Sequence, residues 1–206
     1  MNFFRTDGTV YGVLDKFVNF VLLNLLWLLL CLPIVTIFPA TAAMFGVVRQ
    51  WVQKKDTTGI FKNFFVLFKE NFKQSFLLGA FWFILAYLFY FNISISLQMS
   101  GTLKVITISI LACFLLLFAL TSAFLFPIMV HYKMGLISLI KHSLLFSVTQ
   151  LKVTFLCGIT LMAAIIITYI FSFASIIVWS IAAYNIYRLC DKSFNKIEEM
   201  VQVQSA

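Results

Sequence analysis

The chain has 206 residues, of which 63% are hydrophobic and only 11% are charged, against about 25% charged in a typical soluble domain. So much apolar surface excludes an ordinary soluble protein and favours a membrane protein. The net charge of +8 would suggest nucleic acid as the partner of a soluble protein, but here the basic residues fall between apolar runs, as the positive-inside rule describes. We therefore expect a single membrane domain over residues 1–206, with the lipid bilayer and not nucleic acid as its partner.

The first apolar stretch, 17–48, contains no charged residue but carries Pro33 and Pro39. It is longer than the about 20 residues that cross a bilayer. Proline removes a backbone donor and disfavours helix at the preceding residue, so the sequence predicts a first span at about 17–38 and a new helix after Pro39. We expect no cleavable signal peptide, because the apolar run is longer than a signal core.

A basic, aromatic segment follows at 49–73. Phenylalanines recur there at spacings of three and four residues, which places an aromatic stripe on one face of a helix with lysines beside it. The pattern predicts either an amphipathic helix in the membrane interface, available to a partner, or simply the start of the next span. The candidate docking or interfacial residues are Phe61, Phe64, Phe65, Phe68, Lys69, Phe72 and Lys73.

The remainder alternates between apolar runs and basic segments. A second amphipathic segment is expected at 131–152, and the following stretch, 153–187, is free of charge. As one straight helix that stretch would be about 52 Å long, too long for a single crossing, so two short spans are expected. The predicted spans lie at about 17–38, 75–98, 105–130, 153–169 and 172–188.

The charge distribution decides between four spans and five. With about five spans, all Lys and Arg residues except Arg5, Lys16 and Lys104 lie on one side of the membrane. With four spans the carboxyl-terminal tail changes sides, and the asymmetry is much weaker. The positive-inside rule therefore predicts a multi-pass plasma-membrane protein with its N-terminus outside and its C-terminus in the cytoplasm.

Two pairs of similar stretches suggest an internal repeat. The segment beginning at Lys73 (KQSFLLG) resembles the one beginning at Lys152 (KVTFLCG), and Thr41 with the residues after it resembles the stretch from Thr121. Both units run in the same direction in the expected topology, so the repeat would be parallel, with chance similarity as the alternative. The predicted fold class is all-α: a polytopic helix bundle with about five spans, two amphipathic cytoplasmic segments and this possible repeat.

Catalytic chemistry is not expected. No Asp, Glu, Lys or Arg falls inside an expected span, which argues against an ion-coupled pump but leaves a passive pore open. Motifs of nucleophilic, metalloprotease and nucleotide-binding sites are missing, so we expect no catalytic residue, no metal, no cofactor and no enzyme activity. His131 and His142 lie on the second amphipathic segment without a neighbouring carboxylate, which is typical of interfacial histidines rather than metal ligands. The four cysteines include no C-x-x-C pair and predict no disulfide.

The stretch 24–43 carries the most specific motif. Its residues are Asn24, Trp27, Pro33, Thr36, Pro39 and Thr41. Together with the stretch 68–75, this motif resembles the YesL family of bacterial membrane proteins, whose function is unassigned. The resemblance covers nearly the whole chain. It implies a plasma-membrane protein of Gram-positive-type bacteria, encoded near sugar ABC importers and polysaccharide-degrading enzymes, and it implies no catalytic residues. We expect the break at the prolines to be a structural kink supported by threonine hydroxyls, with a hinge or a ligand site as alternatives.

Three functions remain open. The first is an accessory or interaction subunit linked to carbohydrate uptake, acting with a carbohydrate ABC importer, which the family resemblance and the two amphipathic segments favour. The second is a homo-oligomeric permease or channel for an uncharged solute, which uncharged polar residues within the spans, such as Asn24 and Asn92, would line. The third is a membrane-bound sensor or regulator, which ranks last because the tail after Asp191 is short.

Overall fold

The computed structural model describes residues 8–54, 59–132 and 134–205. Within these ranges the chain forms helices and short connections and no strand, so the predicted all-α class is confirmed. The helices are α1 (Gly8–Cys31), α2 (Ile37–Val52), α3 (Ile60–Gln98), α4 (Thr102–His131), α5 (Leu136–Thr149), α6 (Leu151–Ile170) and α7 (Ser175–Ser205), with 3-10 turns η1 (Ile34–Thr36) and η2 (Ser172–Ala174).

Six of the described helices are long and apolar enough to cross a membrane, against the five spans expected. The expected spans correspond to α1, α3, α4, α6 and α7, and the additional candidate crossing is formed by η1 together with α2. The junction predicted within the long charge-free stretch is present, because α6 ends at Ile170 and η2 leads into α7 at Ser175.

The break after α1 lies earlier than predicted, which corrects the expected span at 17–38. Helix α1 ends at Cys31, because Pro33 disfavours helical backbone at the residue before it. Pro39 does not interrupt a helix at all. It occupies the first turn of α2, where a backbone N–H would have no intrahelical partner.

The hydroxyl group of Thr36 closes this break. Its oxygen lies 2.5 Å from the carbonyl oxygen of Leu30 and 2.7 Å from that of Pro33. The carbonyl of Leu30 lies at the end of α1, where no later turn of the helix supplies a donor. The carbonyl of Pro33 also accepts the backbone N–H of Thr36 at 3.0 Å. The kink is thus supported by a threonine hydroxyl, as the sequence suggested.

Helix α3 continues without interruption for 39 residues, which is about 58 Å at 1.5 Å per residue. Residues 60–73 of the basic aromatic segment form its first third. The segment is thus continuous with the next apolar run, which favours the interpretation as an amphipathic start of that span. The second amphipathic segment behaves differently, because α5 is a separate helix divided from α6 at Gln150.

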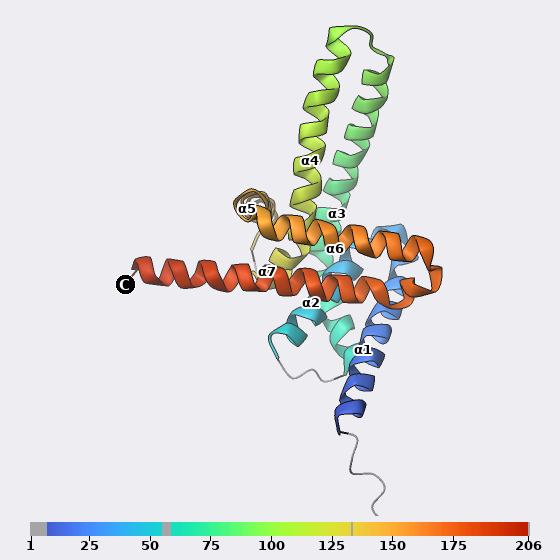
Figure 1. Ribbon diagram of the computed structural model, residues 1–206, viewed down its shortest axis with the longest axis vertical. Coiled ribbons are helices and arrows are strands. Elements are labelled where there is room, and N and C mark those ends of the chain that lie inside the picture. Colours follow the sequence, from blue (N-terminus) through green and yellow to red (C-terminus); the bar gives the residue numbers. More distant parts are fainter. Residues whose placement is uncertain (1–7, 55–58, 133, 206) are drawn as a thin grey trace, which may run out of the picture.

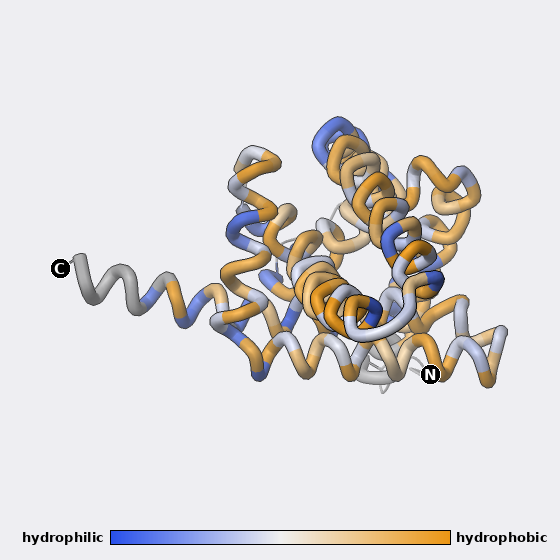
Figure 2. The backbone as a smooth tube through the Cα atoms, turned by 90° about the horizontal axis from the view of Figure 1, so that it is seen from above, coloured by the Kyte–Doolittle hydropathy of each residue, from blue (hydrophilic) through white to orange (hydrophobic). Residues whose placement is uncertain are grey.

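Figure 1 shows two long hairpins that cross one another. The α3–α4 hairpin extends toward the top of the view, and the α6–α7 hairpin runs across it with its turn at the right. The tip of the first hairpin contains Gly101, whose φ of +75° is a conformation that glycine adopts without strain. Most residues along these helices are hydrophobic (Figure 2), and many of their large apolar side chains are exposed, which suits a protein whose solvent is lipid.

The core is built around α2. Nine of its residues are buried, among them Ala42, Ala43 and Gly46, and small residues of this kind let neighbouring helices approach closely. Fully buried side chains from α3, α4 and α7 complete the core: Phe64, Leu78, Phe124, Ile128, Tyr187 and Phe194. An apolar helix with so much of its surface covered by protein is the central helix of the bundle.

The burial pattern supports the internal repeat. The two units are α2–α3 and α4–α5–α6, and several residues 79 positions apart, the separation of Lys73 and Lys152, are buried in both. The matching buried pairs are Ile60 and Leu139, Phe64 and Ser143, Ser75 and Thr154, and Leu78 and Cys157. Thr41 and Thr121 each donate a 2.7 Å hydrogen bond to the carbonyl four residues earlier. This agreement in burial favours a parallel repeat over chance similarity of sequence, although Trp82 is buried and its counterpart Leu161 is half-buried.

Candidate functional site

The motif residues of the first break lie where α1, α2 and α7 meet. Asn24 is fully buried, and its Nδ2 donates a 2.5 Å hydrogen bond to the carbonyl of Ser175 at the start of α7. Its Oδ1 is buried and has no partner. A second tie comes from Ser180, whose hydroxyl donates to the carbonyl of Phe20 at 2.9 Å. These bonds fix the start of α7 against α1.

Trp27 and Thr41 form the next polar contact of the motif. The indole N–H of Trp27 donates to Thr41 Oγ1 at 3.1 Å, while the Thr41 hydroxyl donates to the carbonyl of Ile37 at 2.7 Å. The ring of Trp27 also lies beside that of Trp179, with centroids 5.9 Å apart and planes inclined by 34°. The break between α1 and α2 thus turns α2 back, which brings Thr41 to Trp27.

A cavity of about 270 Å³ lies beside this contact. Its walls come from five helices, α1, α2, α4, α6 and α7, so it includes the first helix of each repeat unit. The walls are mostly apolar, with the rings of Phe45 and Phe126 stacked at 5.8 Å. No Asp, Glu, Lys, Arg or His side chain is among the residues that line it. We call this space the inter-repeat cavity.

A second tryptophan–hydroxyl contact involves Ser122, which lines the inter-repeat cavity from α4. The indole N–H of Trp82 donates to Ser122 Oγ at 2.8 Å, and the Ser122 hydroxyl donates to the carbonyl of Phe118 at 2.7 Å. Sequence analysis of the spans singled out Trp27 and Thr41 but missed Ser122, which is adjacent to the repeat counterpart of Thr41. The repeat itself was the signal that could have found it.

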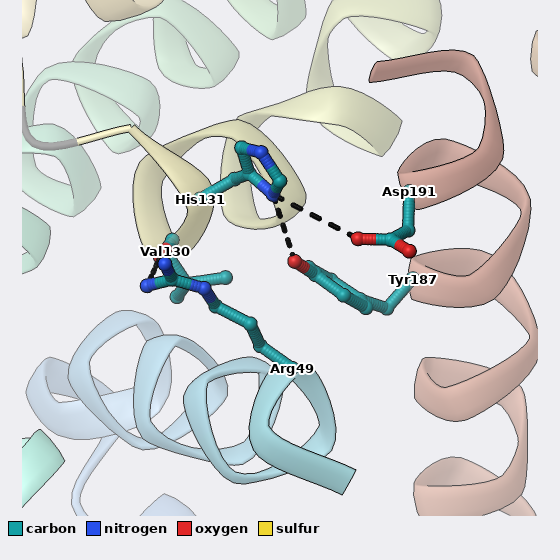
Figure 3. Close-up of polar contacts among 5 residues, drawn as sticks. All are labelled: Arg49, Val130, His131, Tyr187 and Asp191. Carbon is teal, nitrogen blue, oxygen red and sulfur yellow. Dashed lines mark hydrogen bonds and ion pairs between the residues drawn. The ribbon is translucent and has the colours of Figure 1, made fainter. Parts of the chain in front are cut away.

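A polar cluster joins the carboxyl ends of α2 and α4 to the middle of α7 (Figure 3). Tyr187 is fully buried, and its hydroxyl lies 2.9 Å from Nδ1 of His131, which lies 3.9 Å from the carboxylate of Asp191. Arg49 donates from Nη1 to the carbonyl oxygen of Val130, near the carboxyl end of α4. A cation at the carboxyl end of a helix is favourable, because the last carbonyl groups have no intrahelical donor.

This cluster gives His131 a carboxylate neighbour that the sequence did not reveal. No carboxylate is near it in the sequence, but α7 brings Asp191 from the tail, so His131 packs between α4 and α7. His142, by contrast, is exposed on α5. Within the described ranges, no three His, Cys, Asp or Glu side chains come together as metal ligands, and the four cysteines are free.

The candidate docking residues divide into two groups. Phe64 is fully buried and packs in the core, so it is not available to a partner. Phe61, Phe65, Lys69 and Lys73 are exposed, and the remaining two, Phe68 and Phe72, are half-buried with ring centroids 5.4 Å apart. The residues other than Phe64 form a continuous stripe, which we call the α3 face.

Fold and composition together define a multi-pass membrane protein of the helix-bundle class. A family model described as "Protein of unknown function, DUF624" matches residues 20–93, which include the motif of the first break, α2 and most of α3. The chain belongs to this family, and the resemblance to YesL is confirmed by the relatives that follow.

Three relatives come from Bacillus subtilis (strain 168). "Uncharacterized protein YteU" is 33% identical over 154 residues, covering 72% of this chain and 69% of the relative. "Uncharacterized protein YesL" is 24% identical over 192 residues, covering 89% and 88%. "Uncharacterized protein YesV" is 29% identical over 147 residues, covering 68% and 69%. No solved structure matches the chain significantly.

Proposed function

We propose that this protein is an accessory subunit of a carbohydrate ABC importer and that the importer docks on the α3 face. The observation that carries the proposal is the exposure of Phe61 and Phe65 beside Lys69 and Lys73 on the first half of α3. The association with carbohydrate rests on the YesL resemblance. An amphipathic helix that presents aromatic and basic side chains fits an apolar groove with acidic residues at its rim.

The length of α3 supports this role. About 20 residues suffice to cross the bilayer, so a helix of 39 residues extends well beyond the span. The projecting half is anchored at its inner side, where Gln74 donates to the carbonyl of Met134 at 2.7 Å and Phe64 fills the core. The α3 face is therefore held rigidly. Docking would cost little conformational entropy, because most of the side chains involved are already ordered.

The basic residues indicate the side on which docking would occur. If each of the six candidate helices crosses the membrane once, every described Lys and Arg except Lys104 falls in or beside segments on the same side of the membrane. Under the positive-inside rule this side, including the start of α3, is the cytoplasmic one. Both termini then lie on the cytoplasmic side, in contrast to the outside N-terminus expected with five spans.

The test is recovery of the importer with the full-length chain from native membranes. The double variant Phe61→Ala and Phe65→Ala should lose most of the importer permease or ATPase while its own level in the membrane stays unchanged. The matched control replaces exposed phenylalanines on the α3–α4 hairpin, Phe91→Ala with Phe114→Ala, and should recover as much importer as the wild type. Equal recovery by both variants, or no importer with the wild type, would contradict the proposal.

A further inference from the structure

We propose that the inter-repeat cavity binds a small, uncharged molecule of about one ring that carries hydrogen-bond donors. This site is separate from the α3 face, and the inference goes beyond the docking role. It rests on the size of the cavity, its lack of charge, its hydrogen-bonding groups and its aromatic walls.

The size of the inter-repeat cavity sets the size of the ligand. At about 270 Å³ it exceeds the engineered cavity of about 150 Å³ that accepts benzene. It lies near the lower limit of about 300 Å³ for ordinary ligand pockets. A single six-membered ring with a few substituents fits this space, whereas a disaccharide or a nucleotide does not.

The lining favours an uncharged ligand. None of the side chains around the cavity is ionisable, so an ionised group that entered it would give up hydration without gaining a counter-charge. Burying an unpaired charge in an apolar site costs several kcal/mol or more. An uncharged occupant avoids this cost.

The hydrogen bonds determine which polar groups the ligand carries. The hydroxyl groups of Thr41 and Ser122 each donate their proton to a carbonyl of their own helix and accept an indole N–H, from Trp27 and Trp82 respectively. A hydroxyl oxygen has two acceptor positions, so each keeps one for a further donor. These two walls thus select a ligand with O–H or N–H groups.

The aromatic walls favour a flat or ring-shaped ligand. The rings of Trp27 and Trp179 lie side by side, and Phe45 stacks on Phe126 within the same lining. Indole and phenyl faces pack well against rings. The position between the first helices of two parallel repeat units is also where membrane proteins built from repeats place their ligand sites.

Phenol and toluene test the inference, because they are of similar size and differ in one donor. Their affinities for the full-length protein in lipid nanodiscs can be measured by ligand-observed NMR titration. Phenol should bind the wild type more tightly than toluene. Thr41→Val should weaken phenol binding roughly tenfold, the effect of losing one hydrogen bond, and leave toluene binding unchanged.

Filling the cavity is the second arm of the experiment. Ala123→Phe, on the cavity wall, should abolish phenol binding, whereas the same change at the exposed Ala86 of α3 should not affect it. If Ala123→Phe fails to fold, Ala182→Leu on the opposite wall replaces it. The double phenylalanine variant of the α3 face should bind phenol normally, which separates this inference from the docking proposal.

Three results would overturn the inference. Phenol binding that neither cavity-filling variant reduces would show partition into lipid only. Toluene binding as tight as phenol binding, with no effect of Thr41→Val, would show an apolar space without selectivity for donors. A co-purified acyl chain in the native mass spectrum that phenol does not displace would make the cavity a lipid site.

Discussion

Single glycines mark where the helices of this protein touch most closely. A Cβ atom built at Gly79 would lie 2.8 Å from Cγ of Phe38, whereas one built at Gly158, its counterpart in the second repeat unit, would meet no atom within 4 Å. The two units therefore share a burial pattern but differ in how tightly they pack. Gly79 lets α3 lie directly against the first turn of α2.

Alanine at these two positions should have opposite effects. Gly79→Ala should lower the free energy of unfolding by about 1–3 kcal/mol, because Phe38 must move. Gly158→Ala should raise it by up to about 1 kcal/mol, because alanine favours helix and there is room for the methyl group. Thermal unfolding of both variants in the same detergent measures the difference, and equal melting temperatures would contradict the described packing.

The sequence identifies the motif residues of the first break, but it does not predict which residues they contact. Periodicity and proline placement identify Asn24, Trp27 and Thr41 as unusual residues in an apolar stretch. Their contacts with Ser175 and Trp179 join positions more than 150 residues apart in the sequence. The same holds for His131 and Asp191, since only the folding of α7 against α4 brings them together.

At the scale of elements, the break between α1 and α2 decides the course of the chain. The hydroxyl of Thr36 reaches the carbonyl of Leu30 at the end of α1, and Pro39 fits the first turn of α2. Sequence reasoning located the break within a few residues but assigned its end to Pro39. Both prolines look equivalent in the sequence, and only the position of each relative to a helix start distinguishes a breaker from a first-turn residue.

Removing the Thr36 hydroxyl should weaken this break. Thr36→Val keeps the shape of the side chain but leaves the carbonyls of the break without this donor, so the free energy of unfolding should fall by about 1–2 kcal/mol. The control is Thr107→Val, where an exposed threonine bonds only to the carbonyl four residues earlier in α4; that change should have little effect. Chemical denaturation of the detergent-solubilised variants tests this, and equal losses of stability would show that Thr36 has no special role.

Helix α3 shows what a periodic sequence pattern can predict and what it cannot. The spacing of the phenylalanines correctly predicts a helix, yet the same pattern fits a separate interfacial helix and the beginning of a span. The choice depends on whether the backbone continues between the amphipathic and the apolar halves. It continues in α3, whereas α5 and α6 are divided at Gln150, although Asn71 and Gln150 occupy equivalent repeat positions.

At the scale of the whole molecule, α2 adds a sixth candidate crossing. Composition and hydropathy predicted a helical membrane bundle, which the fold confirms. A separate helix after Pro39 was also predicted, but it was not counted among the five spans. Half of its candidate crossing is buried inside the protein. A buried helix of this kind carries small residues where lipid-facing spans carry long apolar side chains, so its sequence looks less like a span. Counting α2 as a crossing leaves Lys104 as the sole described Lys or Arg at the opposite end, where it donates to the carbonyl of Leu97 at 3.1 Å.

The side of the membrane on which the N-terminus lies is the most direct test of the six-crossing fold. A pH-sensitive or phosphatase reporter fused before Met1, compared with the same reporter fused after Ala206 in living cells, measures it. Six crossings with the basic end inside predict that both reporters are cytoplasmic. An external N-terminal reporter with a cytoplasmic C-terminal one would mean five crossings, and would contradict the assignment of α2 as a membrane-crossing helix.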